Sequence, residues 1–177
     1  QAVFLPAMAV AFATAPVAGQ NFGAKQHHRV HDTFRHAVIL GSIIMLIPTL
    51  ICQWRPEYLI RGFSTEAEVV AVGADYLRVI SWNFVVSGVI FTCSGMFQAL
   101  GNTVPSLISS ATRLVTFALP ALWLSTRPGF SLHQVWLLSV VTTAAQAVLS
   151  VLLLRRQLHR HAPIGVVPPP HALASPL

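Results

Sequence analysis

Histidine side chains form the densest group of reactive residues in this chain. Of its eight histidines, four lie in one short segment beside an aspartate: His27, His28, His31, Asp32 and His36. On a helix, residues four apart share a face, so His27 and His31, or His28 and Asp32, have the spacing of metal ligands. Because only one such cluster exists, we expect a solvated basic segment and no metal site. A histidine-rich membrane metalloenzyme is the alternative.

Other catalytic arrangements are missing from the apolar parts of the sequence. These parts contain no Ser-His-Asp, Cys-His or paired-carboxylate arrangement, and no glycine-rich loop of the kind that cradles phosphate. The two cysteines, Cys52 and Cys93, lie in apolar runs, where a thiol behaves as a small hydrophobe. The sequence therefore predicts neither an enzyme nor a resident cofactor.

Polar residues inside one apolar run share a single helical face. At 100° per residue, four of them fall within an arc of about 60°: Asn83, Ser87, Ser94 and Gln98. Similar stripes occur in two later runs, one of serines ending at Arg113 and one from Ser139 to Ser150. Such stripes either line a water-accessible cavity or join helices through hydrogen bonds. Asn83, Ser87, Ser94 and Gln98 are our candidates for lining a cavity.

The segments that carry these stripes are long and nearly free of charge. Hydrophobic residues make up 54% of the chain and charged residues only 9%, whereas a soluble domain has about 25% charged residues. A membrane helix needs about 20 apolar residues. Five segments meet this requirement: 2–19, 37–53, 79–100, 104–125 and 132–154. We predict an all-α, polytopic membrane bundle over residues 1–161.

Charges between the spans predict the orientation of the bundle. Lys25, Arg29 and Arg35 follow the first span, and three further arginines follow the last, whereas acidic residues balance the arginines of the alternate connections. Excess Lys and Arg mark the cytoplasmic side, so the first connection and the C-terminus should be cytoplasmic. The basic residues behind the net charge of +6 lie near span ends and not on one soluble face. This distribution argues against a nucleic-acid partner.

Local signals predict where several elements begin and end. Thr65 and Glu68 have the spacing of a capping box, and the long helix that follows should either bend near Gly73 or tilt strongly. Asn102 and Thr103 should cap the fourth span after a tight turn. The chain begins with Gln1 inside an apolar run, which suggests a truncated start. Residues 162–177 are rich in proline and should form a disordered cytoplasmic tail.

Three linear motifs in register resemble the multidrug and toxic compound extrusion (MATE) family. The run Gln20–Gln26, followed by Arg29, resembles that family's cytoplasmic signature after the second helix of each lobe. Phe63 and the run Tyr76–Arg78 look like the segment leading into its tenth helix. The run Phe97–Thr103, with Pro105 and Arg113, is similar to its connection between the tenth and eleventh helices.

The resemblance implies that the chain is the C-terminal lobe, helices 8–12, of a twelve-helix antiporter whose N-terminal lobe is missing. Such a protein would export small organic, often cationic, compounds across the bilayer of a bacterial inner membrane, driven by H⁺ or Na⁺. Structural or gating roles would fall to Gln20, Asn21, Gly23, Arg29, Gly101, Asn102 and Arg113.

One position departs from the family pattern. The NorM-like branch carries an acid in the middle of its tenth helix, where this chain has Val89. The departure favours the DinF-like branch, whose coupling acid would lie in the N-terminal lobe. Two alternatives stay open: a flippase for lipids or lipid-linked oligosaccharides from the same superfamily, and a membrane subunit that does not transport. A flippase should place several cations in its cavity, and only Arg113 fits.

Overall fold

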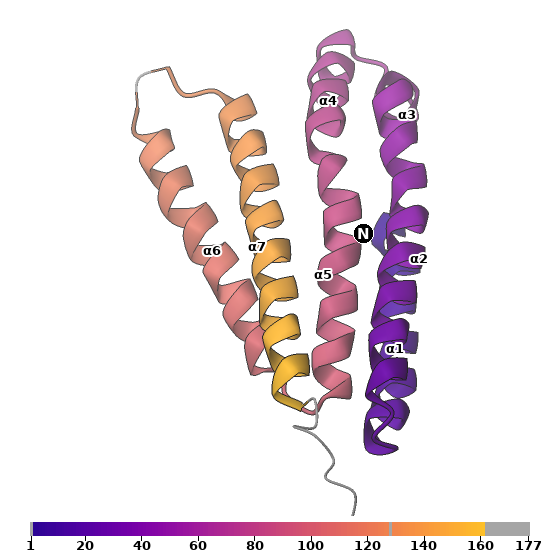
Figure 1. The fold of residues 1–177 in the computed structure, drawn as a ribbon. Coiled ribbons are helices and arrows are strands. Elements are labelled where there is room, and N and C mark those ends of the chain that lie inside the picture. The colour runs from indigo at the N-terminus through magenta and orange to yellow at the C-terminus, as the bar shows by residue number, and fades with distance from the viewer. Residues whose placement is uncertain (1, 128, 162–177) are drawn as a thin grey trace, which may run out of the picture.

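The computed structural model describes residues 2–127 and 129–161, and all regular secondary structure in this part of the chain is helical (Figure 1). The expected proline-rich tail, 162–177, lies outside the described residues. A short 3₁₀ turn, Ala2–Phe4, leads into the first helix. The α-helices are α1 (Leu5–Gly23), α2 (His27–Trp54), α3 (Pro56–Arg61), α4 (Ala67–Ile80), α5 (Trp82–Ala99), α6 (Val104–Ser125) and α7 (Leu132–His161).

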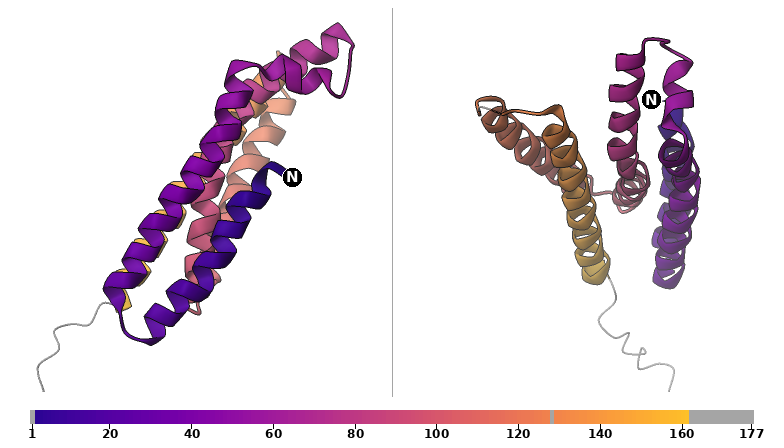
Figure 2. Two further views of the ribbon diagram at one scale, coloured as in Figure 1. Left: turned by 90° about the vertical axis from the view of Figure 1, so that its right-hand side faces the viewer. Right: turned by 90° about the horizontal axis from the view of Figure 1, so that it is seen from above.

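The helices form two groups that share the contact between α5 and α7 (Figure 1, Figure 2). In the first group, α1, α2 and α5 pack against one another, and α3 and α4 continue this group at the end where α2 finishes. In the second group, α6 packs along α7 and contacts α5 only slightly. The α6–α7 pair therefore stands apart from α1 and α2, as the view from above shows (Figure 2).

Four of the five expected spans correspond to helices that are long and apolar enough to cross a bilayer. Among the described residues these are α2, α6 and α7, together with the bent pair α4–α5 taken as one span. The first expected span, 2–19, corresponds to α1, which does not reach the same apolarity. Its last turns contain Gln20 and Asn21. The all-helical membrane fold is confirmed, and the count of five spans stays a prediction.

The tightest packing in the bundle joins α1 to α5. A Cβ atom built on Gly95 would lie 2.5 Å from the carbonyl oxygen of Ala11, so only glycine allows this approach. One turn further along α5, a Cβ built on Gly19 of α1 would lie 3.6 Å from the carbonyl oxygen of Ala99, an ordinary contact distance. Below this contact, Ala18, Phe97 and Leu154 belong to one buried apolar cluster that α1, α5 and α7 share. Close backbone approach thus lets dispersion act over a long seam.

The bend in the third span lies at Ser81, so the expectation of a bend near Gly73 is wrong. The two helices on either side of Ser81 differ in direction by 42°. Gly73 remains inside α4, where it leaves room for the side chain of Ile60 from α3. The break occurs at Ser81 because side chains of α2, Thr49 and Gln53, donate hydrogen bonds to the backbone there. Tertiary partners replace the intrahelical bonds that a bend removes.

The predicted capping box at the start of α4 is also absent. The helix begins close to the expected place, but its N-cap is Glu66, and no side chain caps it. The Oγ atom of Ser64 accepts a hydrogen bond from the backbone N–H of Glu66 at 3.3 Å instead. The turn before α4 leaves Thr65 exposed, and the Ser64 bond is a local side-chain-to-backbone turn contact that precedes the helix.

Candidate functional site

A seam of polar side chains joins α5, α6 and α7 through the apolar part of the bundle. Ser109 of α6 lies 2.6 Å, Oγ to Oγ, from Ser150 of α7, and both are buried. Ser109 also donates to the carbonyl oxygen of Gln146 at 3.3 Å, while the Gln146 amide lies 3.5 Å from the Oγ of Ser110. These bonds hold α6 against α7, as hydrogen bonds between membrane helices do.

The four cavity candidates from α5 occupy different surroundings. Asn83 is buried and donates to the Oγ of Ser139 on α7 at 3.4 Å. Ser94 lies 3.2 Å from the Oγ of Ser106 on α6. Ser87 is half-buried and Gln98 is exposed near the end of the helix. The structure thus turns Asn83 and Ser94 toward the α6–α7 pair. That these four residues line a cavity stays a prediction.

Two buried amide oxygens of this seam have no hydrogen-bond partner among the described residues. They are the Oδ1 of Asn83 and the Oε1 of Gln146. An unpaired buried acceptor costs about 1–3 kcal/mol. The seam is therefore not a fully satisfied packing interface, and it offers two acceptors to a water molecule, a cation or a donor from another part of the protein.

Arg113 lies beside this seam, in a small cavity of about 240 Å³ between α6 and α7. The cavity is lined by Ser110, Arg113, Leu114, Phe117 and Ser139. Arg113 follows the first residue of α6 by nine positions, about 14 Å along the axis. Its side chain is exposed, and it forms no ion pair within the described part of the chain. A guanidinium this far inside a span needs water or an acidic partner.

The first connection forms a compact turn that is shorter than expected. Gln20, Asn21 and Gly23 belong to the last turns of α1. The carbonyl oxygen of Asn21 accepts a hydrogen bond from the backbone of Gln26 at 2.9 Å, and Lys25 has a positive φ of 57°. Gln20 is exposed, like Gly23 and Arg29. The motif thus forms a rigid corner between α1 and α2, which favours a structural role.

The histidine cluster falls on the first turns of α2, so its helical spacing is realised. Nδ1 of His28 lies 3.0 Å from the Asp32 carboxylate, and both side chains are well exposed. Nδ1 of His36 lies 2.8 Å from the backbone oxygen of Asp32 and therefore does not face the same carboxylate. Within the described residues, no group of three His, Cys, Asp or Glu side chains is arranged to hold a metal ion.

The tight turn expected between α5 and α6 is present, but the capping role expected of Thr103 is wrong, because this N-cap residue of α6 makes no side-chain cap hydrogen bond. Gly101 adopts a positive φ of 70°, which glycine accepts without steric cost. The Oδ1 of Asn102 accepts a hydrogen bond from the backbone N–H of Val104 at 3.2 Å. This bond satisfies one of the free donors at the start of α6, so Gly101 and Asn102 determine where α6 begins and how it turns back.

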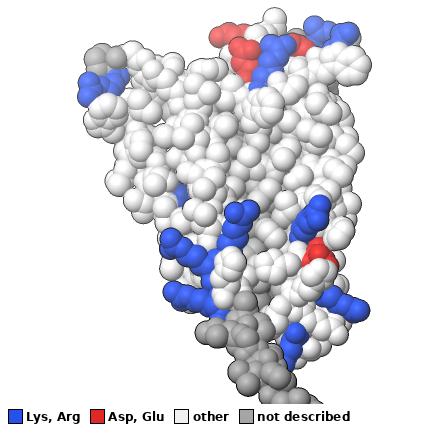
Figure 3. Space-filling view, in the orientation of Figure 1, with Lys and Arg blue, Asp and Glu red and all other residues white. Residues whose placement is uncertain are grey.

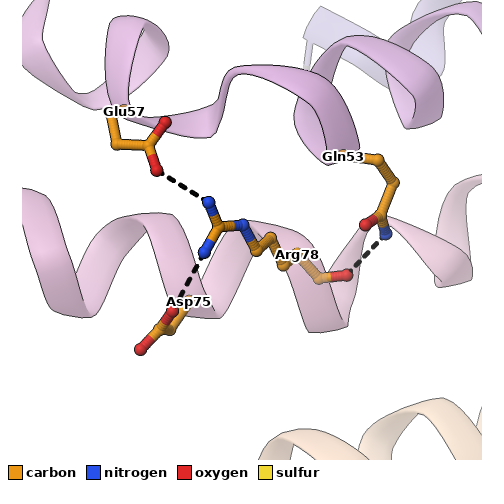
Figure 4. A network of polar contacts seen from close by, with 4 residues as sticks. All are labelled: Gln53, Glu57, Asp75 and Arg78. Atoms are coloured by element: carbon orange, nitrogen blue, oxygen red, sulfur yellow. Dashed lines mark hydrogen bonds and ion pairs between the residues drawn. The ribbon is translucent and has the colours of Figure 1, made fainter.

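One polar network was not anticipated from the sequence (Figure 4). Arg78 of α4 pairs with Glu57 of α3 at 2.7 Å and lies 3.6 Å from Asp75. Its carbonyl oxygen accepts a hydrogen bond from Gln53 of α2 at 2.7 Å. Asp75 and Arg78 are three residues apart on one helix, so the sequence alone could have indicated the contact between them. The other contacts join separate helices and depend on the tertiary fold.

Glu57, Asp75 and Arg78 also border a cavity of about 580 Å³. Its lining includes Glu57, Arg61, Thr65, Asp75 and Arg78. It lies at the end of the bundle where acidic and basic residues mix, whereas basic residues dominate the opposite end (Figure 3). The charge asymmetry expected from the connections therefore follows the long axis of the molecule.

The sequence is similar to those of proteins named as probable multidrug resistance proteins. A chain 33% identical over 135 residues is the "Probable multidrug resistance protein YpnP" of Bacillus subtilis, and the match covers 76% of this chain and 28% of that protein. Another, 31% identical over 113 residues, is the "Probable multidrug resistance protein NorM" of Idiomarina loihiensis, with 60% of this chain and 24% of that protein covered. The chain thus spans about a quarter of the length of these relatives.

A solved structure shows the same arrangement of helices. It is described as the inward-facing conformation of a multidrug resistance MATE family transporter of the MOP superfamily. The TM-score is 0.80 at 21% sequence identity, over 90% of this chain and 37% of that one. This likeness establishes the fold. The MatE family model matches residues 1–124, and the chain therefore belongs to the MATE family of integral membrane transporters.

Proposed function

We propose that this chain forms one lobe of a multidrug efflux antiporter driven by H⁺ or Na⁺. The family match over residues 1–124 carries this proposal. The relatives named as probable multidrug resistance proteins support the class of substrate, which would be small organic, often cationic, compounds. The membrane would be the bacterial inner membrane, with the C-terminus in the cytoplasm, as the basic end of the bundle suggests (Figure 3).

The polar seam supports a role in movement as well as in adhesion. The α6–α7 pair is joined to the remaining helices mainly through α7, because α6 contacts α5 only slightly. Asn83 and Gln146 each retain an unpaired buried oxygen at this boundary. Serine and amide groups can exchange one partner for another when neighbouring helices shift. In the proposed antiporter, the seam would repack as the two lobes rock around a central cavity.

The coupling cation would be bound outside this chain. Its five acidic residues are Asp32, Glu57, Glu66, Glu68 and Asp75. Asp32 pairs with His28 in the first turns of α2, and Glu57 and Asp75 contact Arg78 beside the cavity at the opposite end. None of the five lies on α5, α6 or α7. We propose that the N-terminal lobe supplies the carboxylate, as in the DinF-like branch, and that Arg113 faces the cavity between the lobes.

A lobe exchange tests the proposal. Residues 1–161 would replace the matching segment of the Bacillus subtilis relative, and efflux of a fluorescent cation would be followed in cells that lack their own pumps. We expect the chimera to export the dye when a proton or sodium gradient is present, and the chain expressed alone to export none. A chimera that reaches the membrane in normal amounts but exports nothing would contradict the proposal.

Arg113→Gln in the same chimera tests the proposed site. We expect a fall in efflux of about tenfold, because a cation beside the seam is removed from a region of low dielectric. Arg127→Gln is the matched control: Arg127 follows the other end of the same helix, where its guanidinium stacks over Trp123 at 4.2 Å from the ring centroid. Equal efflux by both variants would show that Arg113 is not part of the proposed site.

A further inference from the structure

A separate cavity lies where α7 ends beside the turn that begins α6. Its volume is about 230 Å³. It is lined by Asn102, Pro105, Leu153, Arg156, Gln157 and Arg160. The four residues from α7 have the spacing i, i+3, i+4 and i+7, so they share one helical face. The cavity is distinct from the seam around Ser109 and from the cavity of Arg113, since none of its lining residues belongs to either.

Gln157 is the unusual member of this lining. Its side chain is only 7% exposed, yet neither its Nε2 nor its Oε1 has a hydrogen-bond partner among the described residues. A buried amide normally makes several hydrogen bonds, because leaving its groups unpaired is costly. The position is tolerated more easily if a ligand with oxygen atoms enters the cavity and accepts from the amide N–H groups.

The charge of the cavity selects an anion. Arg156 and Arg160 line it, and no acidic residue does. The α6 end of the cavity adds the positive end of a helix dipole and the side chain of Asn102. Among the described residues, the only acidic residue at this end of the bundle is Asp32 in the first turns of α2, and its carboxylate pairs with His28. Two guanidinium groups with an amide donor form a suitable site for a phosphate group.

The position of the cavity relative to the bilayer indicates which kind of molecule carries the phosphate group. The helix α7 runs from Leu132 to His161, about 45 Å, whereas the hydrocarbon core is about 30 Å thick. If its start lies at one surface, the last two to three turns extend into the headgroup region of the other leaflet. Those turns carry Arg156, Gln157 and Arg160. Basic pockets between spans at this level bind phospholipid headgroups.

We propose that this cavity binds the phosphate group of an anionic phospholipid in the leaflet next to the C-terminal end of α7. The phosphodiester accepts hydrogen bonds from Arg156 and Arg160 and from the Gln157 amide, while the acyl chains lie along the apolar surface of the bundle. The bound lipid joins the end of α7 to the start of α6. This inference does not depend on the proposed transport activity.

Lipid retention by the purified 177-residue chain tests the site. Native mass spectrometry in detergent would compare phosphatidylglycerol, phosphatidylcholine and inorganic phosphate as added probes. We expect the chain to retain one phosphatidylglycerol in preference to phosphatidylcholine. The double variant Arg156→Gln/Arg160→Gln should lose about tenfold in phosphatidylglycerol affinity. The control variant Arg35→Gln/Arg155→Gln removes two exposed charges at the same end, outside the cavity, and should lose much less.

Gln157→Leu separates a built site from general charge attraction, because this change removes hydrogen-bond donors and no charge. We expect it to weaken phosphatidylglycerol retention severalfold with a melting temperature no lower than that of the unaltered chain, because Leu removes an unpaired buried amide. Equal losses in the two double variants, or full retention by Gln157→Leu, would overturn the proposal. Inorganic phosphate that displaces the lipid at millimolar concentration would support the anion site but assign its source to solution. Binding of neither probe would exclude the site.

Discussion

The close approach of α1 and α5 makes Gly95→Ala the most sharply defined perturbation of this protein. The added Cβ would lie 2.5 Å from the carbonyl oxygen of Ala11 and 3.3 Å from its carbonyl carbon. Ordinary contacts begin near 3.4 Å, so the two backbones would have to separate by close to an ångström. Because the backbone of α5 fixes the position of the Cβ and the atom that it meets belongs to the backbone of α1, no side-chain rotation relieves the clash.

The magnitude follows from two opposing effects. Overpacking a close contact costs about 1–3 kcal/mol, and a backbone clash belongs at the upper end. Alanine in place of glycine favours the helix by about 1 kcal/mol. The net loss is about 2 kcal/mol, which corresponds to a melting temperature lower by about 4–8 °C for a chain of this size. Thermal unfolding in detergent, followed by circular dichroism, measures this shift directly.

Two further glycines provide a graded control for the same measurement. At Gly88 a Cβ would meet the backbone of Gly41 and the side chain of Met45 at 3.3 Å, a mild contact. At Gly23 no atom lies within 4 Å. We expect the melting temperature to fall most for Gly95→Ala, slightly for Gly88→Ala and not at all for Gly23→Ala. A Gly95→Ala protein as stable as Gly23→Ala would refute the packing argument.

Three other changes test the polar contacts. Gln53→Leu removes a hydrogen-bond donor to the bend between α4 and α5. In denaturant titration this change should lower the free energy of unfolding by about 1–2 kcal/mol. An unchanged free energy of unfolding would show that the bend does not depend on this hydrogen bond. Ser109→Ala removes the contact with Ser150 and should lower the melting temperature by the equivalent of about 1 kcal/mol; no change would show that apolar packing suffices. Asn102→Ala removes the hydrogen-bond acceptor of the Val104 N–H. Amide hydrogen exchange at the start of α6 should become faster, and the protein should lose about 1 kcal/mol of stability. Unaltered exchange at the start of α6 would contradict the capping role of Asn102.

The sequence predicted features that depend on neighbouring residues along the chain. The turn at Gly101 and Asn102 was anticipated because the left-handed conformation and the Asx cap both arise within a few residues. The bend was misplaced at Gly73 because glycine is a local signal, whereas the bend at Ser81 depends on donors from another helix. Thr65 was assigned a cap that no side chain supplies, because the turn before α4 leaves Thr65 exposed and Ser64 bonds the N–H of Glu66 instead.

The candidate site likewise has features that the sequence predicted and features that it did not. Helical periodicity placed Asn83 and Ser94 on one face, and both point toward other helices. Periodicity did not reveal that Gln98 is exposed. It also gave no sign that the Gln157 amide is buried without a partner, because burial on α7 is decided by α5 and by the turn before α6.

By itself the sequence determined that this protein is a helical membrane protein and how basic and acidic residues are distributed between its two ends. These properties follow from run length against bilayer thickness and from charge near span ends, both of which are local. The tertiary structure decided where the long span bends, which polar groups find partners, how closely Gly95 approaches Ala11, and where cavities lie. Each of these depends on atoms from helices distant in sequence, whose positions are set by packing of the whole bundle.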